Sequence, residues 1–194
     1  MTMNEGRTVV FALCGSFCTF DKVLPQIGRL VDRGIRVLPL LSFNAAGMDT
    51  RFGRAADWRR RLAELTGAEP ITTLQGAEPL GPQNMANAMV VAPCTGTTLA
   101  KLALGISDTP VTLGVKSMLR GGRPILLAPS TNDGLGASAA HLAALANRKH
   151  FYFVPLSQDD WRKKPASLQS DFSLLPDALE CAVRGRQLQP VLLD

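Results

Sequence analysis

The 194-residue sequence predicts a single α/β domain built on a mostly parallel, doubly wound sheet with helices on both faces. Short apolar runs suited to buried strands alternate with segments of helical periodicity, as in parallel strands joined by crossover helices. Five of these runs end in a polar turn. The composition, 46% hydrophobic and 19% charged, suits an ordinary globular protein whose core needs no disulfide or metal.

In the first half of the chain, three predicted strands alternate with three predicted helices. The strands are apolar runs at residues 8–13, 35–41 and 88–92. The helices carry apolar side chains at helical spacing, at residues 23–31, 55–65 and 97–104. Pro25 predicts that the first helix starts late or kinks, and Pro93 is expected to end the third strand. Residues 42–53 are predicted as a polar loop, and residues 67–83 as an irregular connection with a short strand near 71–74.

The second half continues the alternation of strands and helices. Asp108 or Thr109 is expected to cap a helix that has Pro110 in its first turn and ends at Gly121. Two further helices are predicted, from Asn132 or Asp133 to about 147 and over 174–184. The remaining strands are predicted at residues 123–128, 151–155 and, at the sheet edge, 190–193. The sheet is therefore flavodoxin-like or Rossmann-like in class.

One domain is expected over residues 1–194, in which 157–170 is a charged loop. Residues 156–194 supply a loop, a helix and a tail that pack on the sheet. No apolar run reaches the ~20 residues of a membrane span. Residues 1–8 are polar and lead into the first strand without the apolar stretch of a signal peptide, so we expect a cytoplasmic protein that does not bind membranes.

The cysteines and charges argue against further classes of protein. The four cysteines show no C-x-x-C spacing and are accompanied by only two histidines, so no metal site is predicted. The net charge of +5 is scattered along the chain without an aromatic-interleaved basic stripe. This distribution argues against nucleic acid and favours a small acidic ligand.

The polar turns that follow the strands form the candidate ligand site. In an open α/β sheet, ligands bind at the carboxyl ends of the strands, where N–H groups at helix N-termini hold phosphate. Neither G-x-G-x-x-G nor G-x-x-x-x-G-K-[ST] is present, so a single phosphate, as in FMN, suits these turns better than a dinucleotide or a nucleoside triphosphate. The cofactor-binding candidates are Gly15, Ser16, Phe17, Ser42, Asn44, Pro93, Cys94, Thr95, Thr97, Thr98, Lys101, Ser130 and Thr131.

Groups suited to acid–base chemistry are few. His141 is expected within a helix and His150 before a strand, so neither lies in a ligand turn. Asp133 and Asp159 are near strand-end turns and suit proton transfer, although Asp133 equally suits a helix cap. Two loops carry cations that either hold a dicarboxylate by charge-assisted hydrogen bonds or form a solvated charge run: Arg51, Arg54, Lys163 and Lys164.

Several blocks of the sequence resemble a known family. The pattern A-P-x-T-x-x-T-x-A-K-x-A-x-G-I-x-D over residues 92–108, with Gly15-Ser16 after the first strand, is similar to the flavoprotein superfamily of homo-oligomeric flavin-containing cysteine decarboxylases. Within it, the chain most resembles the family of dipicolinate synthase B subunits, through blocks at residues 14–19, 50–53, 77–82, 130–133, 158–165 and 187–190. The resemblance extends over nearly the whole chain.

This resemblance implies a homo-oligomeric oxidoreductase subunit in the mother-cell cytoplasm of a sporulating bacterium. It also implies that the chain acts with a separate, NADP-binding dipicolinate synthase A subunit. The two subunits together would form pyridine-2,6-dicarboxylate from a dihydrodipicolinate-type intermediate. The implied cofactor is FMN, with Ser42 near its ring and two phosphate-side turns at Gly15, Ser16, Thr95, Thr98 and Lys101.

The sequence departs from the superfamily in three places. Thr97 replaces its turn asparagine, and the turn at residues 129–132 keeps only the proline and the asparagine of its P-A-M-N turn. The histidine that the decarboxylases carry after their second strand has no counterpart between Ser42 and Arg54. Decarboxylation is therefore not the leading expectation.

Three hypotheses of function follow. In the first, a flavin or the partner's nicotinamide accepts hydride from a dihydropyridine dicarboxylate, and Arg51 with Lys163 or Lys164 holds the carboxylates. Asn132 or Asp159 would then be catalytic, orienting the reacting carbon or its leaving proton. In the second, the chain is a non-catalytic partner that binds nucleotide or substrate and completes the A subunit's site. The third is an FMN-dependent decarboxylase.

Overall fold

The computed structural model describes residues 7–193. The expectation of a cytoplasmic protein is based on the polar residues 1–8, of which residues 1–6 lie outside the described part of the chain. Within residues 7–193, no helix combines the length and the apolar character needed to cross a membrane. The described chain forms a seven-stranded sheet. Its strands are β1 (Thr8–Leu13), β2 (Arg36–Leu41), β3 (Ala88–Cys94), β4 (Ile125–Thr131), β5 (Phe151–Phe153), β6 (Leu156–Ser157) and β7 (Leu168–Ser170).

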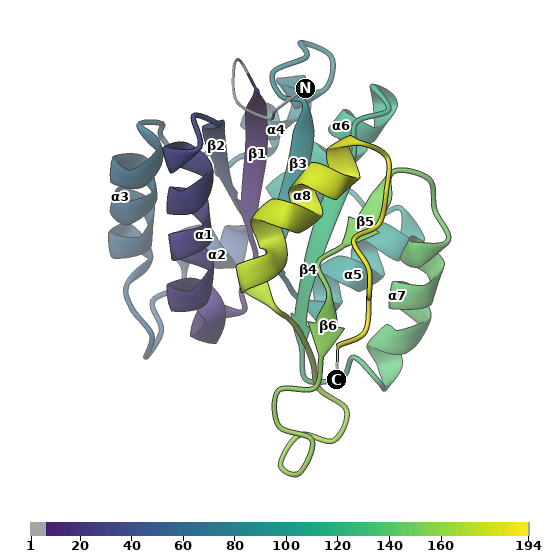
Figure 1. Ribbon diagram of the computed structural model, residues 1–194. Coiled ribbons are helices and arrows are strands. Elements are labelled where there is room, and N and C mark those ends of the chain that lie inside the picture. The colour runs from purple at the N-terminus through teal and green to yellow at the C-terminus, as the bar shows by residue number, and fades with distance from the viewer. Residues whose placement is uncertain (1–6, 194) are drawn as a thin grey trace.

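The parallel part of the sheet has the strand order β2-β1-β3-β4-β5 (Figure 1). The order reverses between β1 and β3, because the chain moves outward from β1 to β2 and then returns to pair β3 on the other side of β1. At the carboxyl end of β4, the short strand β7 pairs antiparallel with it, and β6 pairs antiparallel with β7. The predicted mostly parallel α/β sheet is confirmed.

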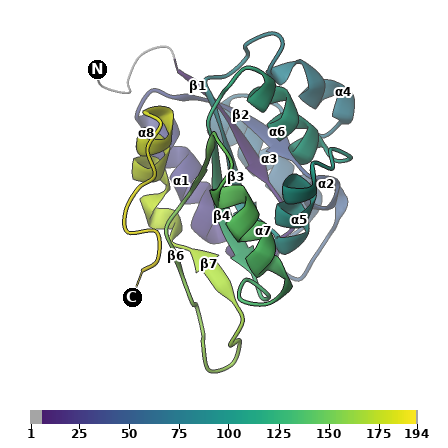
Figure 2. The ribbon, with the colours of Figure 1, turned by 90° about the vertical axis from the view of Figure 1, so that its right-hand side faces the viewer.

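Helices cover both faces of this sheet (Figures 1 and 2). On one face lie α1 (Phe20–Asp32), α3 (Ala55–Thr66) and α8 (Leu175–Val183). On the other face lie α4 (Leu74–Ala77), α5 (Gly96–Leu104), α6 (Pro110–Arg120) and α7 (Ala137–Ala146). The short helix α2 (Phe43–Gly47) follows the carboxyl end of β2.

The strands are buried on both faces, as parallel strands between two helix layers must be. In β1, Phe11 and Leu13 pack toward α1 and α8, whereas Val10 and Ala12 pack toward α5 and α6. This alternation gives two separate hydrophobic layers that share one rigid sheet. The rigid strands fix the positions of the turns at their carboxyl ends, where the candidate site lies.

The first half of the chain departs from prediction at four points. The helix α1 begins at Phe20 and includes Pro25, so the prediction of a late start is wrong. Strand β3 does not end at Pro93 but continues to Cys94, and its register with β4 shifts between Val91 and Cys94. A proline fits inside a strand at such an irregularity, where its missing N–H breaks no ladder bond.

The predicted loop at 42–53 contains α2, because the Ser42 hydroxyl caps this helix by accepting a hydrogen bond from the Ala45 N–H at 3.3 Å. The short strand expected near 71–74 is reduced to a single bridge between Ile71 and Leu40. The helix at Pro110 is confirmed, with Thr109 as its N-cap.

In the second half, the predicted charged loop at 157–170 contains β7 and part of β6, which form a hairpin. The helix expected from Asn132 or Asp133 begins only at Ala137. The Asp133 carboxylate does not cap it, because that carboxylate accepts hydrogen bonds from the hydroxyls of Thr131 and Ser138. The predicted edge strand at 190–193 forms a single bridge to Leu156.

Candidate functional site

A cavity of about 370 Å³ opens at the carboxyl ends of β1, β2 and β3. It lies where the strand order reverses, the position at which open α/β sheets bind their ligands. Seven of the predicted site residues line it together: Gly15, Ser42, Asn44, Thr95, Thr97, Thr98 and Lys101. We call this space the threonine cavity.

Three residues that were not among the predicted site residues also line the threonine cavity: Cys14, Phe43 and Thr109. Phe43 and Cys14 are direct neighbours of the candidates Ser42 and Gly15, so the same turns supply them. Thr109 was predicted only as a helix cap. It enters the site because α6, like α5, begins at this edge of the sheet.

The start of α5 forms the polar wall of the threonine cavity. Thr95 is the N-cap, and its hydroxyl accepts a hydrogen bond from the Thr98 N–H at 3.3 Å. The two hydroxyls of Thr95 and Thr98 lie 3.0 Å apart. Because the first N–H groups of a helix have no partner within it, this end of α5 presents donors and a partial positive charge to the cavity. This arrangement suits a phosphate.

Lys101 adds a full positive charge one turn further along α5. Its ammonium donates to both carboxylate oxygens of Asp108, at 2.9 Å each. The hydrogen bond from Lys101 lowers the pKa of Asp108, so this carboxyl is ionised and fixes the lysine. The ammonium is therefore held in place, with part of its charge balanced before any ligand binds.

The thiols of Cys14 and Cys94 are held in the protonated form. Burial raises the pKa of the Cys14 thiol to about 11, against opposing hydrogen bonds that include one from the Thr98 hydroxyl. That hydroxyl lies 3.3 Å from the Cys14 sulfur. Burial also raises the pKa of Cys94. Since the thiolate is the reactive form, neither side chain is activated as a nucleophile.

The predicted ligands Pro93 and Cys94 do not line the threonine cavity, because both are buried inside β3. The Pro93 carbonyl accepts a hydrogen bond from the Cys14 N–H at 3.2 Å, which ties the first strand-end turn to the third. Their contribution is therefore to place the turn, and the expectation of direct cofactor contact by these two residues does not fit their burial.

A second polar cluster lies between the ends of β1 and β4. The hydroxyls of Ser16 and Ser130 lie 3.0 Å apart. Asp133 accepts from the hydroxyls of Thr131 and Ser138, and these bonds, the first of them foremost, lower its pKa. Ser16 and Ser130 are thus brought together, and Thr131 bonds to Asp133, but none of these residues lines the threonine cavity.

Gly96, the first residue of α5, lies close to Asp133 and its two hydroxyl donors. A Cβ atom there would come within 2.7 to 2.9 Å of oxygens of Ser138, Thr131 and Asp133. Only glycine lets the start of α5 approach the cluster so closely.

Two other predicted site residues do not line the threonine cavity. Phe17 packs its half-buried ring against Phe20, with ring centroids 5.3 Å apart, and Asn132 is exposed.

The predicted cationic loops extend beyond the same sheet edge but do not meet (Figure 1). The guanidinium of Arg51 stacks on the ring of Phe52, 4.8 Å from its centre, and Arg54 is the N-cap of α3. Lys164 pairs with Asp159 at 3.0 Å within the hairpin loop, and the exposed Lys163 belongs to the same loop. None of these four cations lines the threonine cavity.

Asp159 is held as a carboxylate within the hairpin loop. Partial burial opposes its ionisation, but hydrogen bonds from the Ser167 hydroxyl and the Lys164 ammonium outweigh it and lower its pKa. Across residues 7–193, no group of three or more His, Cys, Asp or Glu side chains is placed to hold a metal ion. No histidine of that range lines the threonine cavity.

Residues 1–166 match the model of the family described as Flavoprotein. The chain belongs to the flavoprotein family. Among its relatives, the dipicolinate synthase B subunit of Bacillus subtilis (strain 168) is 42% identical over 194 residues, which are 100% of this chain and 97% of that protein. The crystal structure of the dipicolinate synthase B subunit from Bacillus halodurans has a TM-score of 0.91 at 39% identity and covers 99% of each chain.

More distant flavoproteins share the fold. The crystal structure of the FMN-dependent cysteine decarboxylase SpaF has a TM-score of 0.64 at 22% identity, with 93% of this chain and 99% of that chain covered. At this identity the likeness concerns the fold alone. The two full-length relatives therefore carry the argument about function, and both are B subunits of dipicolinate synthase.

Proposed function

We propose that this chain is the flavin-binding B subunit of a dipicolinate synthase, an oxidoreductase of the mother-cell cytoplasm in a sporulating bacterium. Together with an NADP-binding A subunit, it would form pyridine-2,6-dicarboxylate from a dihydrodipicolinate-type intermediate. The carrying observation is the threonine cavity, which lies where the strand order reverses, in a chain 42% identical to a dipicolinate synthase B subunit.

The residues of the threonine cavity fit FMN. Its volume, about 370 Å³, is within the ordinary range for small-molecule sites. The first turn of α5, with Thr95, Thr97, Thr98 and Lys101, offers hydroxyls, free N–H groups and a cation to a single phosphate. On the β2 side, the exposed ring of Phe43 offers an apolar surface to a flat ring system.

The proposed reaction removes one hydride and one proton from a dihydropyridine ring that bears two carboxylates. Accepting the hydride is the chemistry that a bound flavin or the partner's nicotinamide supplies. Arg51 and Arg54 on one loop, and Lys163 and Lys164 on the other, would hold the carboxylates. Hydrogen bonds lower the pKa of Asp159, so its carboxylate is ionised at neutral pH but is a weak base, and its proposed role is to orient the leaving proton.

Asn132 is the second candidate for orienting the reacting carbon, since it is exposed in the turn that follows β4. The gain from such a site comes mainly from holding the reactants in one geometry. The two cationic loops lie apart in one chain, so a homo-oligomer, which the family resemblance implies, would be one way to bring cations of two copies around one substrate.

The flavin part of the proposal is tested by the visible spectrum of the purified protein with and without added FMN. Bound FMN should shift and sharpen the flavin absorption bands, and gel filtration should leave flavin with the protein. A spectrum identical to that of free FMN, with no flavin retained after gel filtration, would contradict flavin binding.

The catalytic part is tested by assaying the A subunit alone and together with this chain. Turnover that needs both chains is expected. The thin acid–base inventory of the threonine cavity, where Cys14 is neutral and Lys101 is paired with Asp108, favours a second candidate function: a non-catalytic partner that completes the A subunit's site. Full turnover by the A subunit alone would remove the catalytic role.

A further inference from the structure

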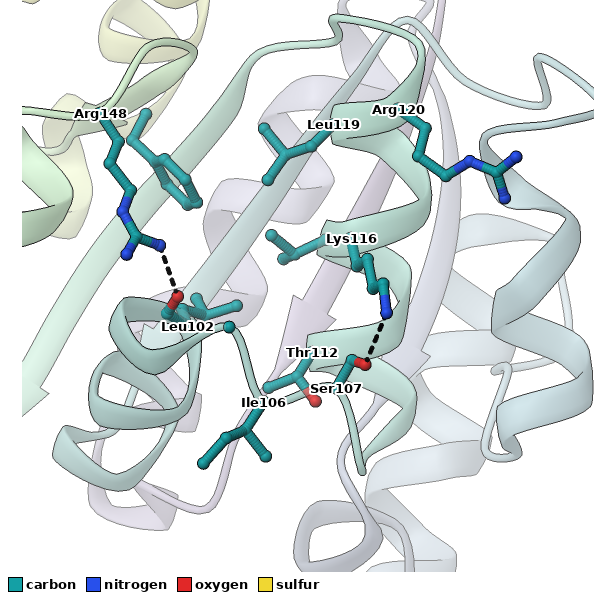
Figure 3. A pocket seen from close by; sticks show the side chains of 11 residues that line it. Leu102, Ile106, Ser107, Thr112, Lys116, Leu119, Arg120 and Arg148 are labelled. Atoms are coloured by element: carbon teal, nitrogen blue, oxygen red, sulfur yellow. Dashed lines mark hydrogen bonds between the residues drawn. The ribbon is translucent and has the colours of Figure 1, made fainter.

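A second cavity, of about 420 Å³, lies between α5 and α6 and shares no lining residue with the threonine cavity (Figure 3). It exists because α5 ends early. Gly105 takes the left-handed conformation at φ 74°, ends the helix and turns the chain back toward the start of α6. The later turns of α6 and the start of β5 are then left uncovered by α5. We call this space the α5–α6 groove.

The inside of the α5–α6 groove is apolar, and so is the edge formed by Ile106, which we call its lip. Its walls carry five apolar side chains, from Leu102, Ile106, Val115, Leu119 and Phe151. Ile106 is 43% exposed at the lip, and the neighbouring Leu104 is 67% exposed. An apolar hollow with exposed aliphatic side chains at its edge and charged side chains around it is typical of an interaction surface.

The charged side chains around the α5–α6 groove all have the same sign. Lys116, Arg120 and Arg148 line it, and no Asp or Glu of the described chain does. Figure 3 shows Arg148 on one side, donating to the Leu102 carbonyl at 3.0 Å, and Lys116 opposite, donating to the Ser107 hydroxyl at 3.4 Å. Arg120 makes no ion pair within residues 7–193.

We propose that the α5–α6 groove docks a protein segment that carries a bulky apolar side chain flanked by carboxylates. The apolar side chain would fill the hollow and cover Ile106, while the carboxylates would pair with the cations of the rim. Resting on the proposed function, the companion subunit of the synthase supplies this segment. The chain's net charge of +5 also favours an acidic partner.

A two-fold symmetric contact between two copies of this chain fits the groove less well. In a two-fold symmetric contact the same patch meets itself, so Lys116, Arg120 and Arg148 would face their own copies across the interface. Like charges in such a contact are unfavourable. A small anion alone would pair with the cations but would leave the lip residue Ile106 exposed.

The test uses titration calorimetry to measure the affinity of this chain for the purified companion subunit. The double charge reversal Lys116→Glu with Arg120→Glu should weaken binding by about tenfold or more, because two attractive contacts become repulsive. Ile106→Asp should weaken binding by a similar factor, since it places a carboxylate at the apolar lip. Arg36→Glu with Arg59→Glu makes the same charge change on exposed arginines of β2 and α3. This control should alter the affinity by less than about threefold.

Four results would overturn the docking proposal: no association of the unmodified chains, unchanged affinity in the groove variants, equal weakening by the control pair, or loss of self-association in the groove variants by sedimentation. The last would mean that copies of this chain cover the groove. FMN titrations of the same proteins separate this proposal from the proposed function. Retained flavin and joint turnover alongside unchanged subunit affinity would leave the function standing and remove only the docking site.

Discussion

The threonine cavity and the two cationic loops differ in what holds their side chains. In the cavity, strand ends and helix caps fix each group, as in the pair of hydroxyls 3.0 Å apart at Thr95 and Thr98. In the loops, each cation is exposed and contacts only its own loop, Arg51 its neighbour Phe52 and Lys164 the nearby Asp159. The cavity is therefore preorganised for a ligand, whereas the loops would have to be organised by one.

The largest loss of FMN affinity is expected on substitution of Lys101. Among the described residues that line the threonine cavity, it is the only lysine. Lys101→Ala should weaken FMN binding by about tenfold to a hundredfold, because the phosphate loses a cation and meets the unpaired carboxylate of Asp108. Asp108→Asn should bind FMN at least as tightly as the unmodified chain. Flavin fluorescence titration measures both, with the exposed Lys149→Ala as the matched control.

If Lys101→Ala and Lys149→Ala bound FMN equally, the threonine cavity would not be a preorganised phosphate site. The phosphate would then lie elsewhere on this edge of the sheet.

The second prediction concerns the two cationic loops and the KM of the two-subunit enzyme. If both loops hold one dicarboxylate, Arg51→Ala and Lys163→Ala should each raise KM by about tenfold in the two-subunit assay. The double variant should then be less than additive, since both side chains serve the same substrate. Arg162→Ala, in the same hairpin loop, is the control. Strict additivity, or an unchanged KM in Arg51→Ala, would show that no clamp forms.

A smaller effect is expected where the threonine cavity meets the polar cluster at the end of β4. Gly96→Ala should lower the free energy of unfolding by about 1 kcal/mol or more, because its Cβ would displace the hydrogen-bonded oxygens of Thr131, Asp133 and Ser138. Gly47→Ala, where a Cβ meets nothing within 4 Å, is the matched control. Urea denaturation measures both. Equal stability of the two variants would mean that this contact is not as close as the structure has it.

The smallest effect concerns the pH dependence of that cluster. Hydrogen bonds from Thr131 and Ser138 lower the pKa of Asp133 below its ordinary 3.8, so the ionised form stabilises the fold. This stabilisation is complete above the ordinary pKa and is lost as the pH falls through the lowered, folded-state pKa. The difference in unfolding free energy between the unmodified chain and Asp133→Asn should be constant from pH 7 to about 5 and shrink below the ordinary pKa.

Asp32→Asn, at the exposed end of α1, is the control for this titration. A difference between the unmodified chain and Asp133→Asn that grew toward acidic pH would contradict the assigned hydrogen bonds.

The same contrast explains what could be predicted from the sequence. The parallel sheet and the turn at residues 94–98 were predictable, because strand periodicity and cap residues act locally along the chain. Seven of the cofactor candidates line one cavity because parallel strands bring their carboxyl ends to one edge. Thr109 entered that cavity without being named, since its place depends on where α5 ends and α6 begins.

Other features depended on contacts distant in sequence. The hairpin of β6 and β7 was predicted as a loop because its pairing partner is the end of β4, where Ser130 pairs with Gln169. The start of α7 was misplaced because Asp133 bonds to Thr131 and Ser138 instead of capping the helix. Whether the loops at 51–54 and 158–165 share a substrate is likewise a question of tertiary distance, which residue spacing does not encode.

The most direct test of the central claim is a crystal structure of this protein with FMN bound. A preorganised phosphate site predicts the phosphate at about 3 Å from the hydroxyl of Thr97 and from the first N–H groups of α5. A phosphate bound instead at the hydroxyls of Ser16 and Ser130, with the threonine cavity filled by solvent, would contradict it.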